Sequence, residues 1–402
     1  VVSPSGTLYL TMTATDDDPI PLIVRSRGER SPRERLLTAG FRALSAVTSR
    51  LQRLPALPTG SCRILVVKPC CLGDVLLTTP VLAALRARFP QATIDYAVGR
   101  HAAPAINCHP EVRRLLDMGP GAGRGVRGLL GLIRRMRAGR YDLCLVLDRS
   151  PLFTILPWPA GISSRAGIDS GGRGFALNVR VPWDESLHEA DLYLSVAGAL
   201  GCPVEGRHLR FEPDLDAAAR VDHLWEQWKL SAPVVAIAPG GGTNPGMDLP
   251  EKRWPAERFA ALADCLHKEY GASILVLGGP ADQAFCTAMR EAMRAPSLDL
   301  CGPAPFSERG ALLRRCDIYI GNDSGPTHLA VAVGCPTVAV FGPTDVGLYG
   351  PYHARARAVH RGLPCSPCFV HGRFPPCPNR HACMRGLPVA DVLAACRELL
   401  IR

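Results

Sequence analysis

The sequence predicts an α/β protein with two doubly wound domains, each a parallel sheet covered by helices. Short apolar runs with the length of buried strands alternate with amphipathic helical patterns, as in strand–helix–strand units. This alternation runs from Cys62 to Leu147 and starts again at Val234. A chain of 402 residues is long enough for two domains of ordinary size. No apolar run reaches the roughly 18–20 residues of a membrane span.

The first half of the pattern contains three expected strands, at 64–67, 93–98 and 141–147, and helices at 79–89 and 129–137. A turn at 69–74 follows the first strand. Pro80 suits the start of the helix after that turn, because the first helical turn does not need its missing N–H.

The second half repeats the alternation and ends in an amphipathic helix. We expect strands at 234–238, 273–277, 317–320 and 336–341, and helices at 255–270, 281–293, 307–315, 326–333 and 389–401. A charged helix at 216–229 lies in the region where the two halves meet. We therefore expect domains at 61–215 and 216–402, with ligands in a cleft between the carboxyl ends of their strands.

Residues 1–60 differ from the rest of the chain: they hold eight Arg against five acidic residues and are rich in Pro, Ser and Thr. We expect a basic extension here, with 1–33 largely disordered. Residues 35–51 fit a basic amphipathic helix with five apolar side chains roughly on one face: Leu36, Leu37, Phe41, Leu44 and Val47. Such a helix either docks on a membrane surface or packs on its own domain.

The formal net charge of +10 fits three kinds of partner: nucleic acid, an anionic membrane surface or an anionic substrate. Aromatic residues make up only 6% of the chain, and no basic stripe interleaved with aromatics occurs. Nucleic acid therefore fits least, and we expect no nucleic-acid partner.

The polar turn at 321–328, which follows an expected strand and opens a helix, predicts a site for a phosphorylated ligand. A helix N-terminus presents free N–H groups and a partial positive charge, so it binds anions. Gly325 also lets the backbone approach a ligand closely. The candidate binding residues are Asp323, Ser324, Gly325, Thr327 and His328.

Three further motifs in the second half could contact a phosphorylated ligand. Gly240 and Gly241 form a turn whose amides can reach a phosphate; a flexible loop is the alternative. Lys252 and Arg253 either neutralise a diphosphate leaving group or lie in a solvated basic loop. Asp282 either bonds a ribose hydroxyl or caps the helix that follows.

Asp74 is the candidate general base of the first half. A carboxylate beside a glycine turn at the carboxyl end of a strand can accept a proton from a substrate hydroxyl. The alternative is that Asp74 caps a helix beginning near Thr78.

The tail contains Cys365, Cys368, Cys377 and Cys383, whose spacing is plausible for a metal site, with His371 and His381 as further candidates. A thiol-lined loop or a redox pair is the alternative. We expect most of the sixteen cysteines to be reduced, since a chain of this length does not need disulfides to hold its core.

Together these motifs resemble the ADP-heptose:lipopolysaccharide heptosyltransferase family, glycosyltransferase family 9. The resemblance covers roughly residues 62–400 and rests on four blocks in order: 64–68 with 72–80; 239–242 with 252–255; 278–280; and 322–328 with 341–344. The Cys365–Cys368 pair is similar to that of many members.

The resemblance implies a GT-B architecture, in which two Rossmann-like domains face each other across a cleft. The acceptor site is expected in the first domain and the nucleotide-sugar site in the second. It implies inverting transfer of a heptose from ADP-heptose to a lipid A–core acceptor, with no required metal or cofactor, at the cytoplasmic face of the inner membrane. Asp74 matches the family's proposed base, Lys252 a residue on the donor phosphates, and Asp323–His328 the donor-binding turn.

The sequence departs from the family at Cys70 and Cys71, where small polar residues are usual, in the loop 244–248, and in residues 1–60, which have no counterpart in short members. Three alternatives remain: a family 9 enzyme with another sugar nucleotide or a glycan or protein acceptor, a sugar-nucleotide epimerase, and an inactive binding or scaffold protein. The joint presence of Asp74, Lys252 and the 323–328 turn argues against the last of these.

Overall fold

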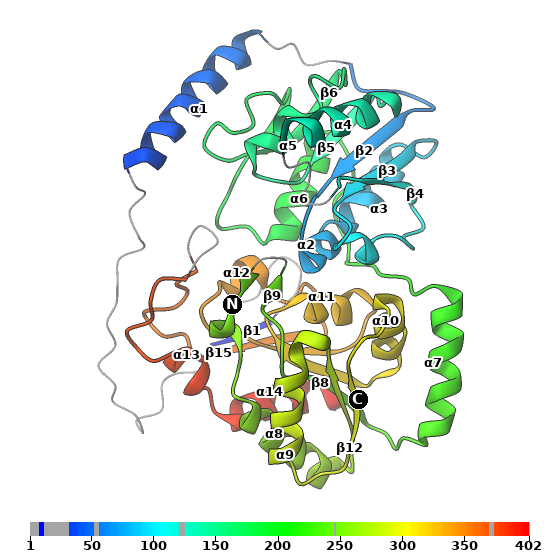
Figure 1. Ribbon diagram of the computed structural model, residues 1–402, viewed down its shortest axis with the longest axis vertical. Coiled ribbons are helices and arrows are strands. Elements are labelled where there is room, and N and C mark those ends of the chain that lie inside the picture. The colour runs from blue at the N-terminus through cyan, green and yellow to red at the C-terminus, as the bar shows by residue number, and fades with distance from the viewer. Residues whose placement is uncertain are drawn as a thin grey trace. The chain divides into compact units, whose positions relative to one another are not determined.

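The computed structural model describes residues 8–11, 32–51, 56–119, 125–244, 247–369 and 374–401 (Figure 1). The chain divides into two compact units, 29–211 and a second unit made of 1–28 and 212–402. The division lies between Phe211 and Glu212, whereas the boundary expected from the sequence lies between 215 and 216.

The 29–211 unit contains a six-stranded sheet in which every pairing is parallel, in the order β4-β3-β2-β5-β6-β7. The strands are β2 Arg63–Val67, β3 Thr93–Val98, β4 Val112–Asp117, β5 Leu143–Val146, β6 Ser164–Asp169 and β7 Val179–Pro182. The α-helices are α1 Pro32–Leu51, α2 Leu72–Leu77, α3 Thr79–Arg88, α4 Gly125–Ala138, α5 Pro151–Ile155 and α6 Glu189–Gly198, and a 3₁₀ turn covers Ala103–Ala105.

The 212–402 unit contains a seven-stranded parallel sheet in the order β1-β15-β14-β13-β8-β11-β12. Its strands are β1 Leu8–Thr11, β8 Val234–Ala238, β11 Ser273–Gly278, β12 Ser297–Cys301, β13 Ile318–Asn322, β14 Thr337–Val340 and β15 Ala356–His360. A separate hairpin pairs β9 Thr243–Asn244 with β10 Met247–Asp248. The helices are α7 Leu215–Trp228, α8 Ala256–Tyr270, α9 Gln283–Ala292, α10 Phe306–Arg315, α11 Gly325–Ala332, α12 Val346–Tyr349, α13 Ala382–Arg385 and α14 Val389–Leu400, with 3₁₀ turns at Pro250–Lys252 and Pro280–Asp282.

The predicted α/β fold with two parallel sheets is confirmed. Each sheet reverses its strand order once, between β2 and β5 in one unit and between β8 and β13 in the other. Ligands of doubly wound sheets bind outside the carboxyl ends of the strands at such a reversal. The fold therefore marks one candidate position in each unit.

The strands that the sequence did not predict lie mostly toward the edges of the sheets. They are β4, β6 and β7 in one unit and β12, β15 and β1 in the other. Strands such as β4 (VRRLLD) and β12 (SLDLC) are only partly buried and mix charged with apolar residues, so they lack the continuous apolar run of a central parallel strand. The expected disorder of 1–33 is wrong for Leu8–Thr11, which pairs with β15.

Helix α1 packs on the 29–211 unit through one side, as the second of the two alternatives for the basic helix predicted, while four of its five predicted apolar side chains stay exposed. The Phe41 ring stacks on Phe175 with 6.1 Å between centroids. The Arg180 guanidinium donates to Ser45 Oγ at 2.7 Å and to Thr48 Oγ1 at 2.9 Å. Within the described ranges, no helix has the length and apolar content needed to cross a membrane.

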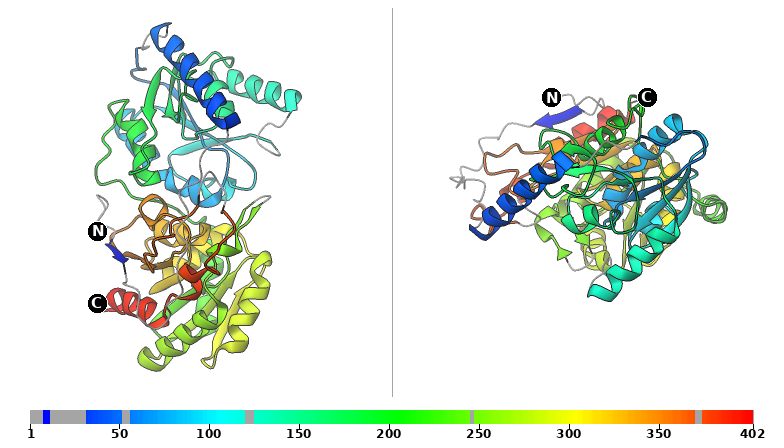
Figure 2. Two further views of the ribbon diagram at one scale, coloured as in Figure 1. Left: turned by 90° about the vertical axis from the view of Figure 1, so that its left-hand side faces the viewer. Right: turned by 90° about the horizontal axis from the view of Figure 1, so that it is seen from above.

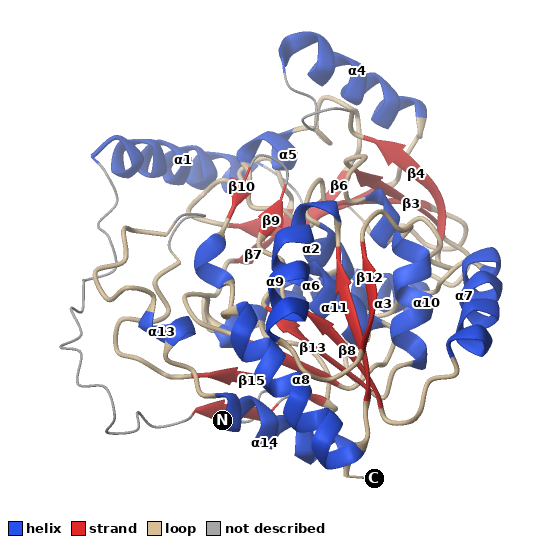
Figure 3. Cartoon of the chain, turned by 60° about the horizontal axis from the view of Figure 1, so that its bottom comes forward, coloured by secondary structure: helices blue, strands red, loops and turns tan. Residues whose placement is uncertain are grey.

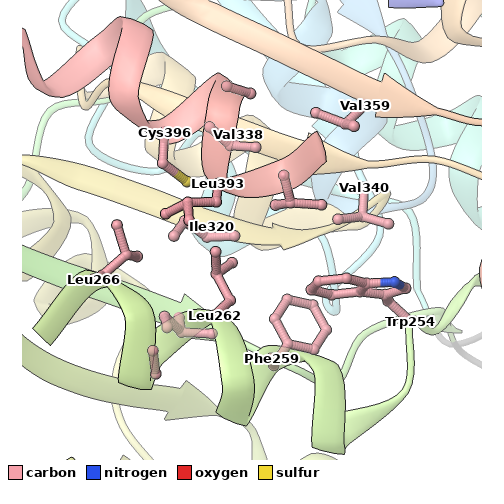
Figure 4. Close-up of a cluster of buried hydrophobic side chains, with 14 of the residues drawn as sticks. Trp254, Phe259, Leu262, Leu266, Ile320, Val338, Val340, Val359, Leu393 and Cys396 are labelled. Carbon is pink, nitrogen blue, oxygen red and sulfur yellow. The ribbon is translucent and has the colours of Figure 1, made fainter. Parts of the chain in front are cut away.

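The largest fully buried side chain of the second unit is Trp254, in a core that helices α8 and α14 close over one face of the sheet (Figures 3 and 4). Its ring meets Phe259 edge-on at 4.9 Å between centroids, and its Nε1–H donates to the Leu387 carbonyl at 3.1 Å. This one side chain therefore packs against the start of α8 and also holds the loop that precedes α14.

Trp254→Ala should lower the free energy of unfolding of its unit by about 3–5 kcal/mol, because it leaves a large cavity and removes one of the two donors to the Leu387 carbonyl, the other being the Arg258 guanidinium. Urea unfolding followed by circular dichroism measures the change. Trp158→Ala is the matched control, since Trp158 is 55% exposed and should cost less than about 1 kcal/mol. Equal effects of the two substitutions would contradict the assigned core.

Candidate functional site

In the 212–402 unit, the turns that follow β8 and β13 are held together by the buried side chain of Asn322. Its Nδ2 donates to the carbonyls of Pro239 and Gly240, both at 2.9 Å. Its Oδ1 accepts from the backbone N–H of Trp254 at 3.0 Å. We call residues 239–242, which follow β8, the glycine turn. Asn322 thus fixes the glycine turn, the end of β13 and the backbone at Trp254 to one another at the strand-order reversal.

Lys252 and Asp323 meet at this position. The Lys252 Nζ lies 2.5 Å from Asp323 Oδ2, and Thr344 Oγ1 donates to the same oxygen at 2.6 Å. Both members of the pair are largely buried, so the alternative of a solvated loop is wrong for Lys252. An ammonium carries three donors, and a carboxylate that uses one of them leaves two for a further anion.

The glycine turn itself is braced by Asp282. One carboxylate oxygen accepts from Gly241 N at 2.9 Å and the other from Gly279 N at 2.8 Å. Its side chain makes no cap bond to α9 itself, but it caps the 3₁₀ turn Pro280–Asp282 that leads into α9, because it accepts from the backbone N–H of the N-cap residue Gly279. Gly240 is required here because an added Cβ would overlap the Asp282 carboxylate. The ribose contact of Asp282 stays a prediction.

Gly241 has a φ of +99°, and a Cβ there would lie 2.7 Å from the Ser324 Cβ. The glycine turn and the start of α11 therefore approach each other closely. Ser324 is the N-cap residue of α11, but its Oγ donates to the Asn322 carbonyl at 3.1 Å and does not cap the helix. This arrangement leaves the positive end of the α11 dipole beside the Lys252–Asp323 pair.

The other predicted residues of the 321–328 turn are Gly325, Thr327 and His328, and the last two are buried. Thr327 Oγ1 donates to the Asn322 carbonyl at 2.6 Å. Gly325 begins α11 and is half-buried. The structure thus brings Lys252, Asp323, Ser324 and the glycine turn together, while the hydroxyl of Thr327 holds the backbone of the turn.

In the 29–211 unit, Asp74 lies in the first turn of α2, after β2. Helix α2 begins at Leu72, so the expected turn at 69–74 is shorter than predicted and Asp74 does not cap a helix near Thr78. Its carboxylate is 41% exposed, and its Oδ2 lies 3.4 Å from the Nζ of Lys68. The carboxylate is thus accessible to a substrate hydroxyl, as a general base must be.

Lys68 is the centre of a charged group that the sequence analysis did not identify. Its Nζ donates to the Tyr193 hydroxyl at 2.9 Å and lies 4.0 Å from Asp148 Oδ2. Burial disfavours the ammonium, but Tyr193, Asp74, Asp148 and Glu189 favour it, and the pKa of Lys68 lies well above its ordinary value. Lys68 therefore stays charged at neutral pH.

A signal for two of these residues was present in the sequence. Lys68 follows β2 and Asp148 follows soon after β5, the two strands between which the order reverses. The rule that selected Asp74, a polar side chain at the carboxyl end of a strand, selects them too. Tyr193 and Glu189 come from α6, which was not predicted, so only the tertiary structure places them here.

The four tail cysteines lie close enough to influence one another. Burial and the neighbouring thiols raise the pKa of Cys368 to about 11 and that of Cys383 to about 12, and both Cys365 and Cys377 contribute. Thiols with such pKa values are protonated near neutral pH. In the part of the chain that is described, no group of three or more His, Cys, Asp or Glu side chains forms a metal site; His371 lies outside it.

Comparison with protein families shows a match over residues 129–376 to the model of "Glycosyltransferase family 9 (heptosyltransferase)". Lipopolysaccharide heptosyltransferase 3 of Escherichia coli K12 is 27% identical over 353 residues, which cover 82% of this chain and 95% of that protein. Lipopolysaccharide heptosyltransferase 2 of the same strain is 29% identical over 312 residues, covering 74% and 87%.

Two solved structures share the fold. A family 9 glycosyltransferase from Veillonella parvula superposes with a TM-score of 0.74 at 26% identity, covering 86% of this chain and 99% of that one. The ADP-heptose lipopolysaccharide heptosyltransferase II of E. coli superposes with a TM-score of 0.67 at 24% identity, covering 84% and 98%.

Lys68→Met should destabilise the 29–211 unit by about 1–3 kcal/mol at pH 7, because Tyr193, Asp74 and Asp148 lose their shared cation. Since the pKa of Lys68 is raised on folding, its contribution is complete below the unfolded-state value and is lost only as the pH rises through the folded-state value. Urea unfolding should therefore give a constant difference from wild type between about pH 7 and 9.5. Lys268→Met, which removes an exposed ammonium from α8, should change little; an equal loss would rule out the buried network.

Proposed function

The chain belongs to glycosyltransferase family 9, and we propose that it moves a heptose from ADP-L-glycero-D-manno-heptose to a lipopolysaccharide (lipid A–core) acceptor with inversion at the anomeric carbon. The observation that carries the proposal is the pairing of Lys252 with Asp323 beside the start of α11. The heptose and the acceptor are supported by the two E. coli relatives, both of which are lipopolysaccharide heptosyltransferases.

On the donor side, we expect the diphosphate to bind where the Lys252 ammonium, the glycine-turn amides and the α11 N-terminus converge. Breaking the bond between the anomeric carbon and the phosphate oxygen leaves an electron pair, and hence a negative charge, on the departing ADP. A cation and a helix dipole in fixed positions stabilise that charge. No metal or cofactor is required in this proposal.

On the acceptor side, Asp74 accepts the proton of the acceptor hydroxyl while the oxygen forms its bond to the anomeric carbon. The proton then leaves the carboxyl group for solvent, so the base is restored after each transfer. Lys68 acts as a positioning residue: its buried ammonium, fixed by Tyr193 and Asp148, holds the Asp74 carboxylate in place.

The proposed partners are a nucleotide-sugar donor and a lipid-linked saccharide acceptor at the cytoplasmic surface of the inner membrane, where the chain associates peripherally. An anionic donor and an anionic membrane surface both suit a net charge of +10.

Asp74→Asn should lower kcat for transfer by about 10²-fold or more, because the neutral amide cannot accept the acceptor proton, while affinity for the donor should stay near the wild-type value. Steady-state assay of ADP release with a lipid A–core acceptor measures the change. Asp184→Asn removes an exposed carboxylate from the same unit and serves as the control. Loss of donor affinity in Asp74→Asn would instead indicate a structural role.

Lys252→Ala should weaken binding of ADP by about tenfold or more, since a charge-assisted contact to phosphate is lost. Isothermal titration calorimetry in EDTA measures the affinity, and Lys268→Ala is the matched loss of an exposed lysine. An unchanged dissociation constant for Lys252→Ala would refute the assigned phosphate site.

The same calorimetry with ADP, UDP and GDP separates the proposal from its alternative. Selective, metal-independent binding of ADP supports a heptosyltransferase. Preference for UDP or GDP would indicate a related family 9 enzyme that uses another sugar nucleotide or a glycan or protein acceptor. Absence of binding to all three would contradict a glycosyltransferase site at Lys252.

A further inference from the structure

Helix α1 packs on its own unit with a side that is mostly polar. The side chains that face the unit are Thr38, Phe41, Ser45 and Thr48, which recur at the three- and four-residue spacing of one helix face. A Cβ at Gly172 would lie 2.6 Å from the α1 backbone at Phe41 and Arg42, so the contact is close. The helix is therefore held firmly, and not by its leucines.

The apolar side of α1 faces solvent. Leu36, Leu37, Leu44 and Val47 are 75%, 58%, 42% and 56% exposed, and we call these four side chains the leucine face. Positions 36, 40, 43, 44 and 47 adjoin on a helix, so Gly40 and Ala43 extend the face between them. An amphipathic helix on a globular protein normally turns its apolar stripe to the core. The reverse orientation marks a surface that binds something apolar.

The charge of α1 indicates which apolar partner fits. The helix carries Arg33, Arg35, Arg42 and Arg50 against one acid, Glu34. By helical geometry, Arg50, Arg35 and Arg42 follow one another around the flank between the leucine face and the packed side, with Arg50 next to the leucine face and Arg42 next to Thr38. Exposed leucines bordered by arginines are typical of helices that lie in the plane of a membrane interface.

We propose that α1 docks the chain on an anionic membrane surface, with the leucine face at the boundary between headgroups and acyl chains and the arginines at the lipid phosphates. The proposal deepens the proposed function, because it names the element that would bring the chain to a lipid-linked acceptor. A second copy of the chain fits the same face less well, since a symmetric contact would place the arginines of two α1 helices against each other.

Helix α4 of the same unit also combines exposed apolar side chains with several arginines. Val126 and Leu130 are 74% and 47% exposed, four residues apart, and the helix carries Arg127, Arg134, Arg135 and Arg137 with no acid in its first turn. In the two views of Figure 2 both helices, α1 in blue and α4 in blue-green, lie at the outside of the 29–211 unit. Helix α4 is thus a second element that can contact the same kind of surface.

The test is co-sedimentation of the full chain with vesicles of phosphatidylcholine alone or mixed with phosphatidylglycerol, without donor or acceptor. We expect binding to the anionic vesicles and much weaker binding to the neutral ones. Leu36→Glu with Leu44→Glu should lower the partition coefficient by about 10²-fold, because two charges enter the apolar side of the interface. Leu215→Glu, on a leucine of α7 that is 87% exposed, is the control and should bind like wild type.

Arg42→Gln with Arg50→Gln tests the charge separately from the leucines. Each basic residue near an anionic surface contributes a factor of about five in affinity, so the pair should cost roughly 10–25-fold, and added salt should reduce the wild-type affinity toward that of the variant. An affinity for anionic vesicles that changes neither with added salt nor with these two substitutions would overturn the proposed anionic partner.

Two readouts keep a negative result interpretable. Circular dichroism and the melting temperature of Leu36→Glu/Leu44→Glu should stay close to wild type, since both side chains are exposed. Transfer to a delipidated, soluble acceptor should also be unchanged in this variant. Wild-type chain that fails to bind anionic vesicles but transfers heptose overturns the docking proposal alone. A dimer that the double variant dissociates, without vesicle binding, overturns it in favour of a self-contact.

Discussion

The buried carboxamide of Asn322 is the interaction on which the donor-side site depends. One side chain at the end of β13 satisfies two carbonyls of the turn after β8 and one amide of the segment that enters α8. All three groups are buried from water, so each would cost free energy without its partner. With them satisfied, the glycine turn, Lys252 and the start of α11 have fixed relative positions, as stabilisation of a departing anion requires.

In the 29–211 unit, charged side chains hold one another in place at the strand-order reversal. Lys68 is an ammonium taken out of water at the strand-order reversal, a position that would be costly without partners. Tyr193 and the carboxylates of Asp74 and Asp148 surround it, and its raised pKa shows that their attraction exceeds the cost of burial. Asp74 remains partly exposed at the edge of this group. A carboxylate can thus be accessible to substrate and yet restrained by a buried partner.

Helix α1 shows why amphipathic patterns alone do not assign a buried face. The sequence placed Leu36, Leu37, Phe41, Leu44 and Val47 on one side, and only Phe41 of these packs on the unit. The packed side is held by the hydrogen bonds of Arg180 with Ser45 and Thr48, and with this side on the unit the leucines face outward. Hydrophobic periodicity is the same for a helix that covers a core and for one that lies on a membrane.

The sequence by itself determined the two α/β halves, the central strands and the turns at the ends of β8 and β13, because buried parallel strands and glycine turns leave local signals. It also identified Asp323, which directly follows β13, Asp74, which lies beyond the short turn after β2, and Lys252, which lies just before the helix that follows β8. The edge strands, the Lys68 network and the role of Asp282 as a brace between two turns were decided only by the tertiary structure. These features rest on contacts between segments far apart in the chain, such as Lys68 with Tyr193 and Gly241 with Asp282. No local pattern of residues records which distant partner satisfies a buried charge or amide.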